Sequence, residues 1–151
     1  MKNSDDIFWM KHALSLAQTA AKQDEVPVGA VIVSEGKIIS TGINQREALN
    51  KATSHAEVCA IEKANSVLKS WRLSNATLYV TLEPCLMCAG AIYQSRISRV
   101  VYGAKDPKGG ALGSLYKIHE DSRLNHNFDI TEGILKDECS QILKDFFKAK
   151  R

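Results

Sequence analysis

Apolar residues recur at helical spacing near the start of the chain, in residues 5–22. The positions that carry this pattern are Phe8, Ala13, Leu14, Ala17, Ala20 and Ala21. Ser4 or Asp5 precedes them, and short polar side chains of this kind cap the free N–H groups of a helix start. The pattern therefore predicts an amphipathic helix over residues 5–22.

Three later stretches also have helical character. Residues 54–69 are rich in Ala, Glu and Leu, and Ser54 is placed to cap them. Residues 84–95 begin with Pro84, which is favoured in the first turn of a helix, and residues 135–150 return to helical periodicity. The sequence thus predicts four helices in all.

Between the helices lie short runs rich in β-branched residues, bounded by turn signals. The predicted strands are residues 26–33, 37–44, 76–83 and 98–104. The first two are separated by Glu35 and Gly36, which indicates a hairpin.

The order of these elements predicts an α/β fold, a three-layer α/β/α sandwich with a mixed central sheet, formed by a single domain over residues 1–151. In this arrangement the helices over residues 54–69 and 84–95 lie side by side. Both follow strand ends or loops at the same edge of the sheet. We therefore expect their N-termini, and any ligands carried there, to converge.

Composition narrows the possibilities without deciding the function. Hydrophobic residues make up 44% of the chain and charged residues 25%, close to the averages for globular proteins. The N-terminal stretch contains charged residues that break a signal peptide, and no run is apolar enough for a membrane span, so a cytoplasmic location is expected. Thiols stay reduced there, which makes the four cysteines candidates for metal binding, catalysis or simple burial. The formal net charge of +3 permits an acidic partner such as RNA without requiring one.

His55, Cys85 and Cys88 form a candidate metal site at the two converging helix starts. Residues three apart, such as Cys85 and Cys88, share one face of a helix. The free N–H groups of a helix start favour thiolates, which are the form that binds metals. One imidazole with two thiolates is a zinc set that leaves the fourth position open, as catalytic zinc requires.

Glu57 supplies the second part of the chemistry. Residues two apart in a helix point about 200° away from each other, so His55 and Glu57 share a site only if His55 stands at the very start of its helix, with Ser54 as the cap. A zinc ion held here would supply a hydroxide near neutral pH, which is what attack on a ring carbon bearing an exocyclic amine requires. Glu57 then moves protons from the water to a ring nitrogen and to the departing ammonia.

These residues resemble a known family. SHAE at residues 54–57 and EPCLMC at 83–88 match the H-x-E and P-C-x-x-C pair of the cytidine-deaminase-like zinc superfamily, for which this mechanism is described. Nearly the whole chain resembles the bacterial tRNA-specific adenosine deaminases, which convert the wobble adenosine of an anticodon to inosine as homodimers. The stretches that carry this resemblance are VPVGAVIV at 26–33, Gly42, Asn44 and Arg46, SWRL at 70–73, residues 76–92, residues 99–115, LNH at 124–126 and KDFF at 144–147.

The resemblance implies roles for several residues. It implies one zinc ion per subunit, a tRNA anticodon loop as partner, and no membrane. The substrate-binding residues it implies are Asn44, Ala56 and Glu57 at the flipped base, Asp106 and Lys108 at the anticodon nucleotides, and Phe147 and Arg151 along the RNA. Asn127 stands where many relatives have Arg after Asn-His.

Alternatives remain open at this stage. Cys59, four residues after His55, would complete a closed Cys3His set, which is a structural zinc site without chemistry. Asn44 and Asp106 are also compatible with ordinary turns. At the level of function, the alternatives are a zinc deaminase of a free base or nucleotide, of the guanine or cytosine type, and a structural-zinc RNA-binding protein.

Overall fold

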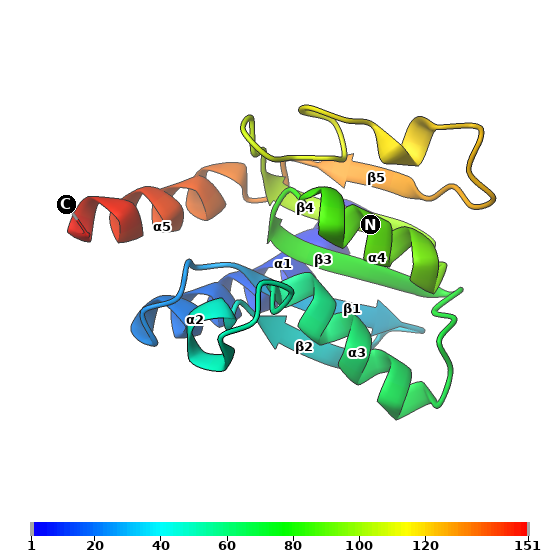
Figure 1. Ribbon diagram of the computed structural model, residues 1–151, viewed down its shortest axis with the longest axis horizontal. Helices are drawn as coiled ribbons and strands as arrows, with labels where there is room; N and C mark the ends of the chain where they lie inside the picture. Colours follow the sequence, from blue (N-terminus) through cyan, green and yellow to red (C-terminus); the bar gives the residue numbers. More distant parts are fainter. Residues whose placement is uncertain (1, 151) are drawn as a thin grey trace.

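A computed structural model of the protein describes residues 2–150, which form one five-stranded sheet with helices on both faces (Figure 1). The strand order is β2-β1-β3-β4-β5. The strands are β1 Gly29–Ser34, β2 Lys37–Ile43, β3 Ala76–Leu82, β4 Arg99–Ala104 and β5 Asp129–Glu132.

The sheet is mixed, as the sequence predicts. β1 and β2 form the expected antiparallel hairpin, and β1 also pairs antiparallel with β3. Both turn residues of the hairpin have positive φ, 52° at Glu35 and 73° at Gly36, the backbone that matches the twist of paired strands. β3, β4 and β5 run parallel, so the carboxyl ends of β3 and β4 meet at one edge of the sheet.

The helices complete a three-layer sandwich, which confirms the predicted fold class. α3 and α4 lie on one face of the sheet and α1 and α5 on the other (Figure 1). The helices are α1 Lys2–Lys22, α2 Arg46–Leu49, α3 Ala56–Leu68, α4 Leu86–Ser95 and α5 Lys136–Ala149, with a short 3-10 helix, η1, at Ile118–Glu120.

Alternation along the strands sends neighbouring side chains into two different cores. In β1, Ile32 packs in the core under α3 and α4, and Val31 packs in the core under α1 and α5. In β3, Leu78 and Tyr79 divide in the same way. Strands buried on both faces explain why the sequence shows near-continuous apolar runs here.

A glycine at the end of β2 brings α3 close to the sheet. A Cβ atom at Gly42 would lie 2.2 Å from the carbonyl oxygen of Ala56 and 2.7 Å from the backbone nitrogen of Ala60. Only glycine allows this approach. It places the first turn of α3, with Ala56 and Glu57, directly beside the segment that carries Asn44.

Helix starts are the main point where the structure corrects the sequence prediction. Ser54 is not the cap of α3, because the helix begins at Ala56 and His55 is its N-cap residue. Pro84 does not open α4 either, because Cys85 is the N-cap residue and the helix begins at Leu86. His55 thus occupies the capping position that we expected for Ser54, and Cys85 is a capping residue where we expected it inside the first turn of the helix.

Short elements were also missed. β5, α2 and η1 contain few apolar residues, so their periodicity is too weak to read. α1 extends to Lys2, three residues before the predicted start.

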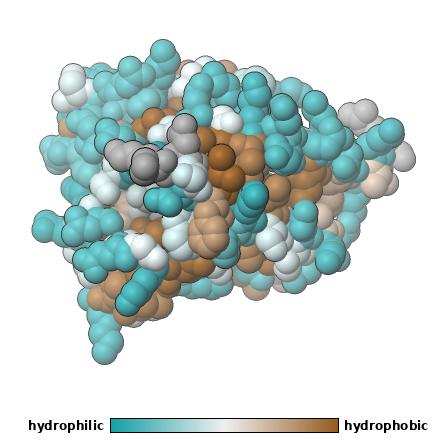
Figure 2. Space-filling view, turned by 180° about the vertical axis from the view of Figure 1, so that it is seen from behind, coloured by the Kyte–Doolittle hydropathy of each residue, from teal (hydrophilic) through white to brown (hydrophobic). Residues whose placement is uncertain are grey.

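The outer surface opposite α3 and α4 has an apolar band surrounded by hydrophilic side chains (Figure 2). α1 lies on this side and carries Ile7 and Phe8, which are partly exposed. Among the described residues, no helix is long and apolar enough to cross a membrane.

Candidate metal centre and base pocket

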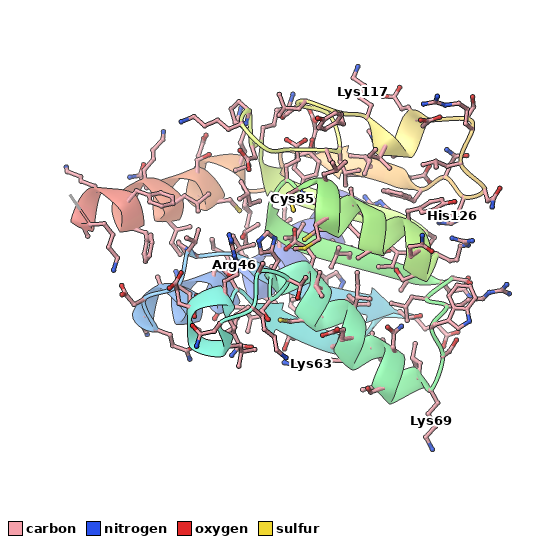
Figure 3. The ribbon with its side chains drawn as sticks, in the orientation of Figure 1. Arg46, Lys63, Lys69, Cys85, Lys117 and His126 are labelled. Atoms are coloured by element: carbon pink, nitrogen blue, oxygen red, sulfur yellow. The ribbon has the colours of Figure 1, made fainter. Side chains whose placement is uncertain are left out.

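His55 and Cys85 are the N-cap residues of α3 and α4, and both have extended backbone, with ψ of 155° and 178°. Neither side chain bonds to the N–H groups of its own helix. Both side chains are therefore free to point into the space between the two helix starts. Figure 3 shows Cys85 at this end of α4, with Arg46 of α2 nearby and Lys69 at the far end of α3.

The three ligand candidates converge as predicted. The Nδ1 atom of His55 lies 3.6 Å from the Sγ atom of Cys85 and 3.4 Å from that of Cys88. All three ligand atoms lie within 4.8 Å of one another. Ligands about 2.0–2.3 Å from a tetrahedral zinc ion are separated by roughly 3.5–3.8 Å. The residues therefore fit zinc in both donor type and spacing.

Charge in this cluster is concentrated on Cys85. A hydrogen bond from the Cys88 thiol, followed by one from His55, lowers the pKa of Cys85 to about 3, although burial opposes the shift. Cys88 donates this bond and is buried, so its pKa is raised. The Cys85 thiolate in turn raises the pKa of His55. Cys85 is thus a thiolate that a cation can bind, and metal binding would release the proton of Cys88.

Glu57 lies in the first turn of α3, and only 4% of its surface is exposed. Burial raises the pKa of Glu57 to about 7. A carboxyl group with a pKa near neutrality can both take up and release a proton, as a general acid-base catalyst must. His55 and Glu57 share one cavity, because the extended N-cap backbone of His55 removes the conflict that their two-residue spacing creates within a helix.

This cavity has a volume of about 170 Å³ and is open on one side. Two of the metal-ligand candidates line it together with other polar and apolar residues. The residues that line it are Val26, Val28, Asn44, Arg46, His55, Ala56, Glu57, Leu82, Glu83, Cys85 and Asp106. Three of the predicted substrate-binding residues, Asn44, Ala56 and Asp106, are therefore together at the metal cluster.

Asn44 closes the end of β2 and also forms part of the cavity wall. Its Nδ2 atom donates to the carbonyl oxygen of Val26 at 3.3 Å, and its Oδ1 atom accepts from the backbone N–H of Arg46 at 3.3 Å. Asn44 thus closes a turn and lines the cavity at the same time. Its amide has one further hydrogen and one further lone pair that these two bonds do not use.

Lys108 and Phe147 lie in a second, larger groove of about 870 Å³ that adjoins the cavity at Asp106. The groove runs between α5 and the loop after β4. Its lining consists of Val26, Leu82, Lys105, Asp106, Lys108, Leu143, Lys144, Phe147 and Lys148. Asp106 also forms a turn, because its Oδ1 atom accepts from the backbone N–H groups of Lys108 and Gly109. Arg151 lies outside the described residues.

Several pocket residues were not predicted from the sequence. Val26, Val28 and Leu82 look like ordinary strand residues, and nothing in their pattern marks them as pocket walls. Glu83 did carry a signal, because a carboxylate at the end of a buried strand and directly before Pro84-Cys85 needs partners.

Cys59 does not join the metal cluster. It lies in a separate groove between β2 and α3, with Ser40 and Lys63 among its neighbours. Burial raises the pKa of the Cys59 thiol, so the thiolate form is disfavoured. Among the described residues, only His55, Cys85 and Cys88 form a group with metal-ligand geometry. This arrangement argues against a closed Cys3His site.

Comparison with known proteins places this geometry in a family. The MafB19-like deaminase family matches residues 4–151. The chain is 45% identical over 148 residues to the tRNA-specific adenosine deaminase of Bacillus subtilis strain 168, covering 98% of this chain and 92% of the relative. The chain belongs to the tRNA-specific adenosine deaminase family.

Two solved structures that the chain resembles come from deaminases with different substrates. One, from a study of A-to-I editing by tRNA:A34 deaminases at the wobble position, matches with a TM-score of 0.86 and 45% identity, covering 89% of this chain and 97% of the other. The guanine deaminase of Bacillus subtilis matches with a TM-score of 0.61 and 44% identity, covering 64% of this chain and 62% of the other. The match to the tRNA-specific deaminase thus spans more of both chains.

Proposed function

We propose that this deaminase hydrolyses the wobble adenosine of a tRNA anticodon loop to inosine and ammonia. The observation that carries the proposal is the single cavity that holds His55, Cys85, Glu57 and Asn44 and opens next to the lysine-lined groove. A site for one flipped base beside a cationic groove is what an RNA-directed deaminase requires.

His55, Cys85 and Cys88 would hold one zinc ion. The bound ion supplies a Lewis acid that lowers the pKa of a coordinated water molecule. The protein would hold these ligands in fixed positions, because His55 and Cys85 are the N-cap residues of α3 and α4 and Cys88 lies in the first turn of α4, and both helices pack into the core.

Glu57 is the proton carrier in this proposal. Its pKa near 7 lets the carboxylate take a proton from the attacking water and deliver it to a ring nitrogen of the base. The carboxylate then takes the second proton of the water, from the new hydroxyl group on the attacked ring carbon, and delivers it to the amine, which leaves as ammonia while the carbonyl of inosine forms. Each transfer needs no rearrangement of the backbone, because Glu57 is held in the first turn of α3.

The walls of the cavity suit an adenine ring. Val28 and Ala56 offer apolar surface to its faces, and the Asn44 amide offers a donor and an acceptor to its edge. A loop nucleotide that is already unstacked enters such a pocket at low cost.

The groove beside the cavity suits the rest of the loop. Lys105, Lys108, Lys144 and Lys148 bring positive charge to it, and Phe147 is 46% exposed there. Lysines bind phosphates and exposed aromatic rings stack on splayed bases. A tRNA substrate also fits a cytoplasmic location. The sequence predicts this location, and it stays a prediction.

We also propose that the enzyme is a homodimer. Three large apolar side chains, Leu86, Leu115 and Tyr116, are each more than half exposed. Leu86 follows Cys85 in the chain, and the backbone N–H groups of Leu115 and Tyr116 donate to the carbonyl oxygen of Gly110, which pairs with Cys85. An apolar surface of this kind fits a second copy of the chain. Sedimentation equilibrium should give twice the chain mass, and Leu115→Asp should reduce it to the mass of one chain. A single-chain mass for the active wild type would contradict the dimer.

One assay tests the catalytic proposal against its alternatives. The zinc-loaded enzyme is incubated with a tRNA bearing adenosine at the wobble position, and separately with free adenine, guanine and cytosine. Inosine in the tRNA and ammonia from that reaction alone are expected. Ammonia from guanine but not from the tRNA would support the guanine type instead, and no product from any substrate would support a structural zinc protein.

A further inference from the structure

Glu83 is a buried carboxylate that the proposed chemistry does not use. It follows the last residue of β3, and only 2% of its surface is exposed. No lysine or arginine among the described residues forms an ion pair with it. Burying a charged group in this way is unfavourable unless hydrogen bonds compensate.

The compensation comes from one loop, residues 105–116, which follows β4 and carries Asp106 and Lys108. The Oε1 atom of Glu83 accepts from the backbone N–H of Asp106 at 3.0 Å and from the hydroxyl of Ser114. Its Oε2 atom accepts from the backbone N–H groups of Leu112 at 3.1 Å and Ser114 at 3.0 Å. Burial alone would raise the pKa of Glu83, but these four donors lower it. The Glu83 carboxylate thus accepts hydrogen bonds from both ends of the loop.

The same loop is attached to the metal-ligand segment through the backbone. The N–H of Ala111 donates to the carbonyl oxygen of Pro84 at 2.9 Å, and Gly110 pairs with Cys85 in an antiparallel bridge. Residues 83–85 therefore hold the loop at three consecutive positions, and the third position is a proposed zinc ligand.

Gly110 makes room for the carboxylate. A Cβ atom at this position would lie 2.2–2.4 Å from the Cδ, Oε1 and Oε2 atoms of Glu83. A side chain there would push the carboxylate away from its donors. The loop can therefore pack against the Glu83 carboxylate because residue 110 has no side chain.

We propose that Glu83 is a positioning residue that sets the RNA-contacting loop, with Asp106 and Lys108, at a fixed distance from the metal and the base pocket. The inference rests on the proposed RNA substrate for its kinetic consequence. It assigns Glu83 no contact with the reacting atoms. Loss of the carboxylate should therefore weaken substrate binding more than the chemical step.

Glu83→Gln is the first test. The amide replaces one acceptor oxygen by a donor, so at least one buried N–H of the loop loses its partner whichever way the amide is turned. We expect zinc content to be retained, amide hydrogen exchange at Asp106, Leu112 and Ser114 to rise about tenfold or more, and KM for the tRNA to rise about tenfold with kcat changed less than about threefold.

Two further variants keep the test decisive. Gly110→Ala leaves Glu83 in place but displaces its carboxylate, and we expect the same pattern of faster exchange and raised KM. Ser114→Ala removes one of the four donors and should have a much smaller effect. If Glu83→Gln does not fold, Gly110→Ala compared with Ser114→Ala decides the question.

The exchange measurement needs no substrate, so it separates this inference from the proposed function. Unchanged exchange in the loop of Glu83→Gln or Gly110→Ala would overturn the positioning role. A loss confined to kcat with KM unchanged would overturn it as well. If the wild type deaminates no tRNA, the proposed function fails, while faster exchange with retained zinc still supports the role of Glu83 in holding the loop.

Discussion

The Nδ1 atom of His55 and the Sγ atom of Cys85 lie 3.6 Å apart, although the residues are 30 positions apart in the chain and cap two different helices. Each residue stands just outside its helix, in extended backbone. This position turns both side chains toward the neighbouring helix start. It also leaves the following turn of each helix free to present Glu57 and Cys88 to the same site.

Replacing Glu57 by Gln should abolish proton transfer without disturbing the metal ligands. Glutamine keeps the shape of the side chain but cannot take up a proton at neutral pH. We expect deamination to fall by about 10²–10⁴-fold while one zinc ion per chain is retained. Inosine formation and zinc content by atomic emission measure the two effects. Activity within tenfold of the wild type would remove Glu57 from this role.

Replacing Cys59 by Ala should leave both zinc content and deamination unchanged. The Cys59 side chain lies in the groove between β2 and α3, away from the three converging ligand atoms. Cys88→Ala is the matched control, since it removes a buried thiol that does belong to the cluster and should lose the metal. Loss of zinc in Cys59→Ala would restore the closed structural site.

Removing two lysines from the groove beside α5 should weaken RNA binding in a salt-dependent way. In Lys108→Ala with Lys144→Ala, we expect KM for the tRNA to rise. The slope of log Kd against log salt concentration should fall by about 0.7 for each phosphate group that the protein no longer neutralises. The kcat should stay close to that of the wild type. Lys69→Ala, at the opposite end of α3 (Figure 3), is the control and should change neither KM nor the slope.

Asp6 anchors α1 to the sheet and should matter for stability alone. Its carboxylate forms two hydrogen bonds with the Arg99 guanidinium, at 2.9 and 2.7 Å, and accepts a third from the Tyr79 hydroxyl at 2.9 Å. Asp6→Asn leaves a partly buried guanidinium without its counter-charge, so we expect the free energy of unfolding to fall by about 2–3 kcal/mol. Urea denaturation measures this loss. Activity per folded molecule should be unchanged, and an equally stable variant would contradict the anchoring role.

His119 should make the fold less stable in mild acid. Burial lowers the pKa of His119, and its Nδ1 atom has no hydrogen-bond partner in the described part of the chain. The unfolded chain, with a histidine pKa of about 6.5, therefore binds more protons than the folded one below that pH. Stability should fall as the pH drops below about 6.5 toward the lower folded-state pKa. His119→Asn should show a smaller loss of stability than the wild type between pH 7.5 and 5.5, measured by urea denaturation at each pH.

The metal cluster was predictable because its signals are local. Cys85 and Cys88 are three apart beside a proline, His55 and Glu57 frame a helix start, and the strand order brings both helix starts to one edge of the sheet. The capping position itself was not predictable, because Ser54 is a better capping residue than His55 by preference. Tertiary contacts determine where α3 begins, because Gly42 lets the backbone of Ala56 pack against the sheet.

The walls around the cluster depend on contacts between distant segments. Val26 belongs to the chain before β1 and Leu82 to the end of β3, and only the folded sheet makes them neighbours in one cavity. β5 escaped detection for a related reason, since its pairing with β4 is short and its residues are only partly buried. Weak local patterns of this kind acquire structure only when the rest of the sheet is present.

A metal ion bound between His55 and Cys85 would also act as a cross-link. It would close a loop of 30 residues that contains all of α3 and β3. Closing this loop costs little entropy in the folded chain, where both ends are already held together, and much more in the unfolded chain, so the ion would bind the folded state preferentially. Binding free energy at such a site becomes folding free energy. A chelator should therefore lower the melting temperature as well as stop catalysis, and the free metal concentration would set the fraction of molecules that are folded.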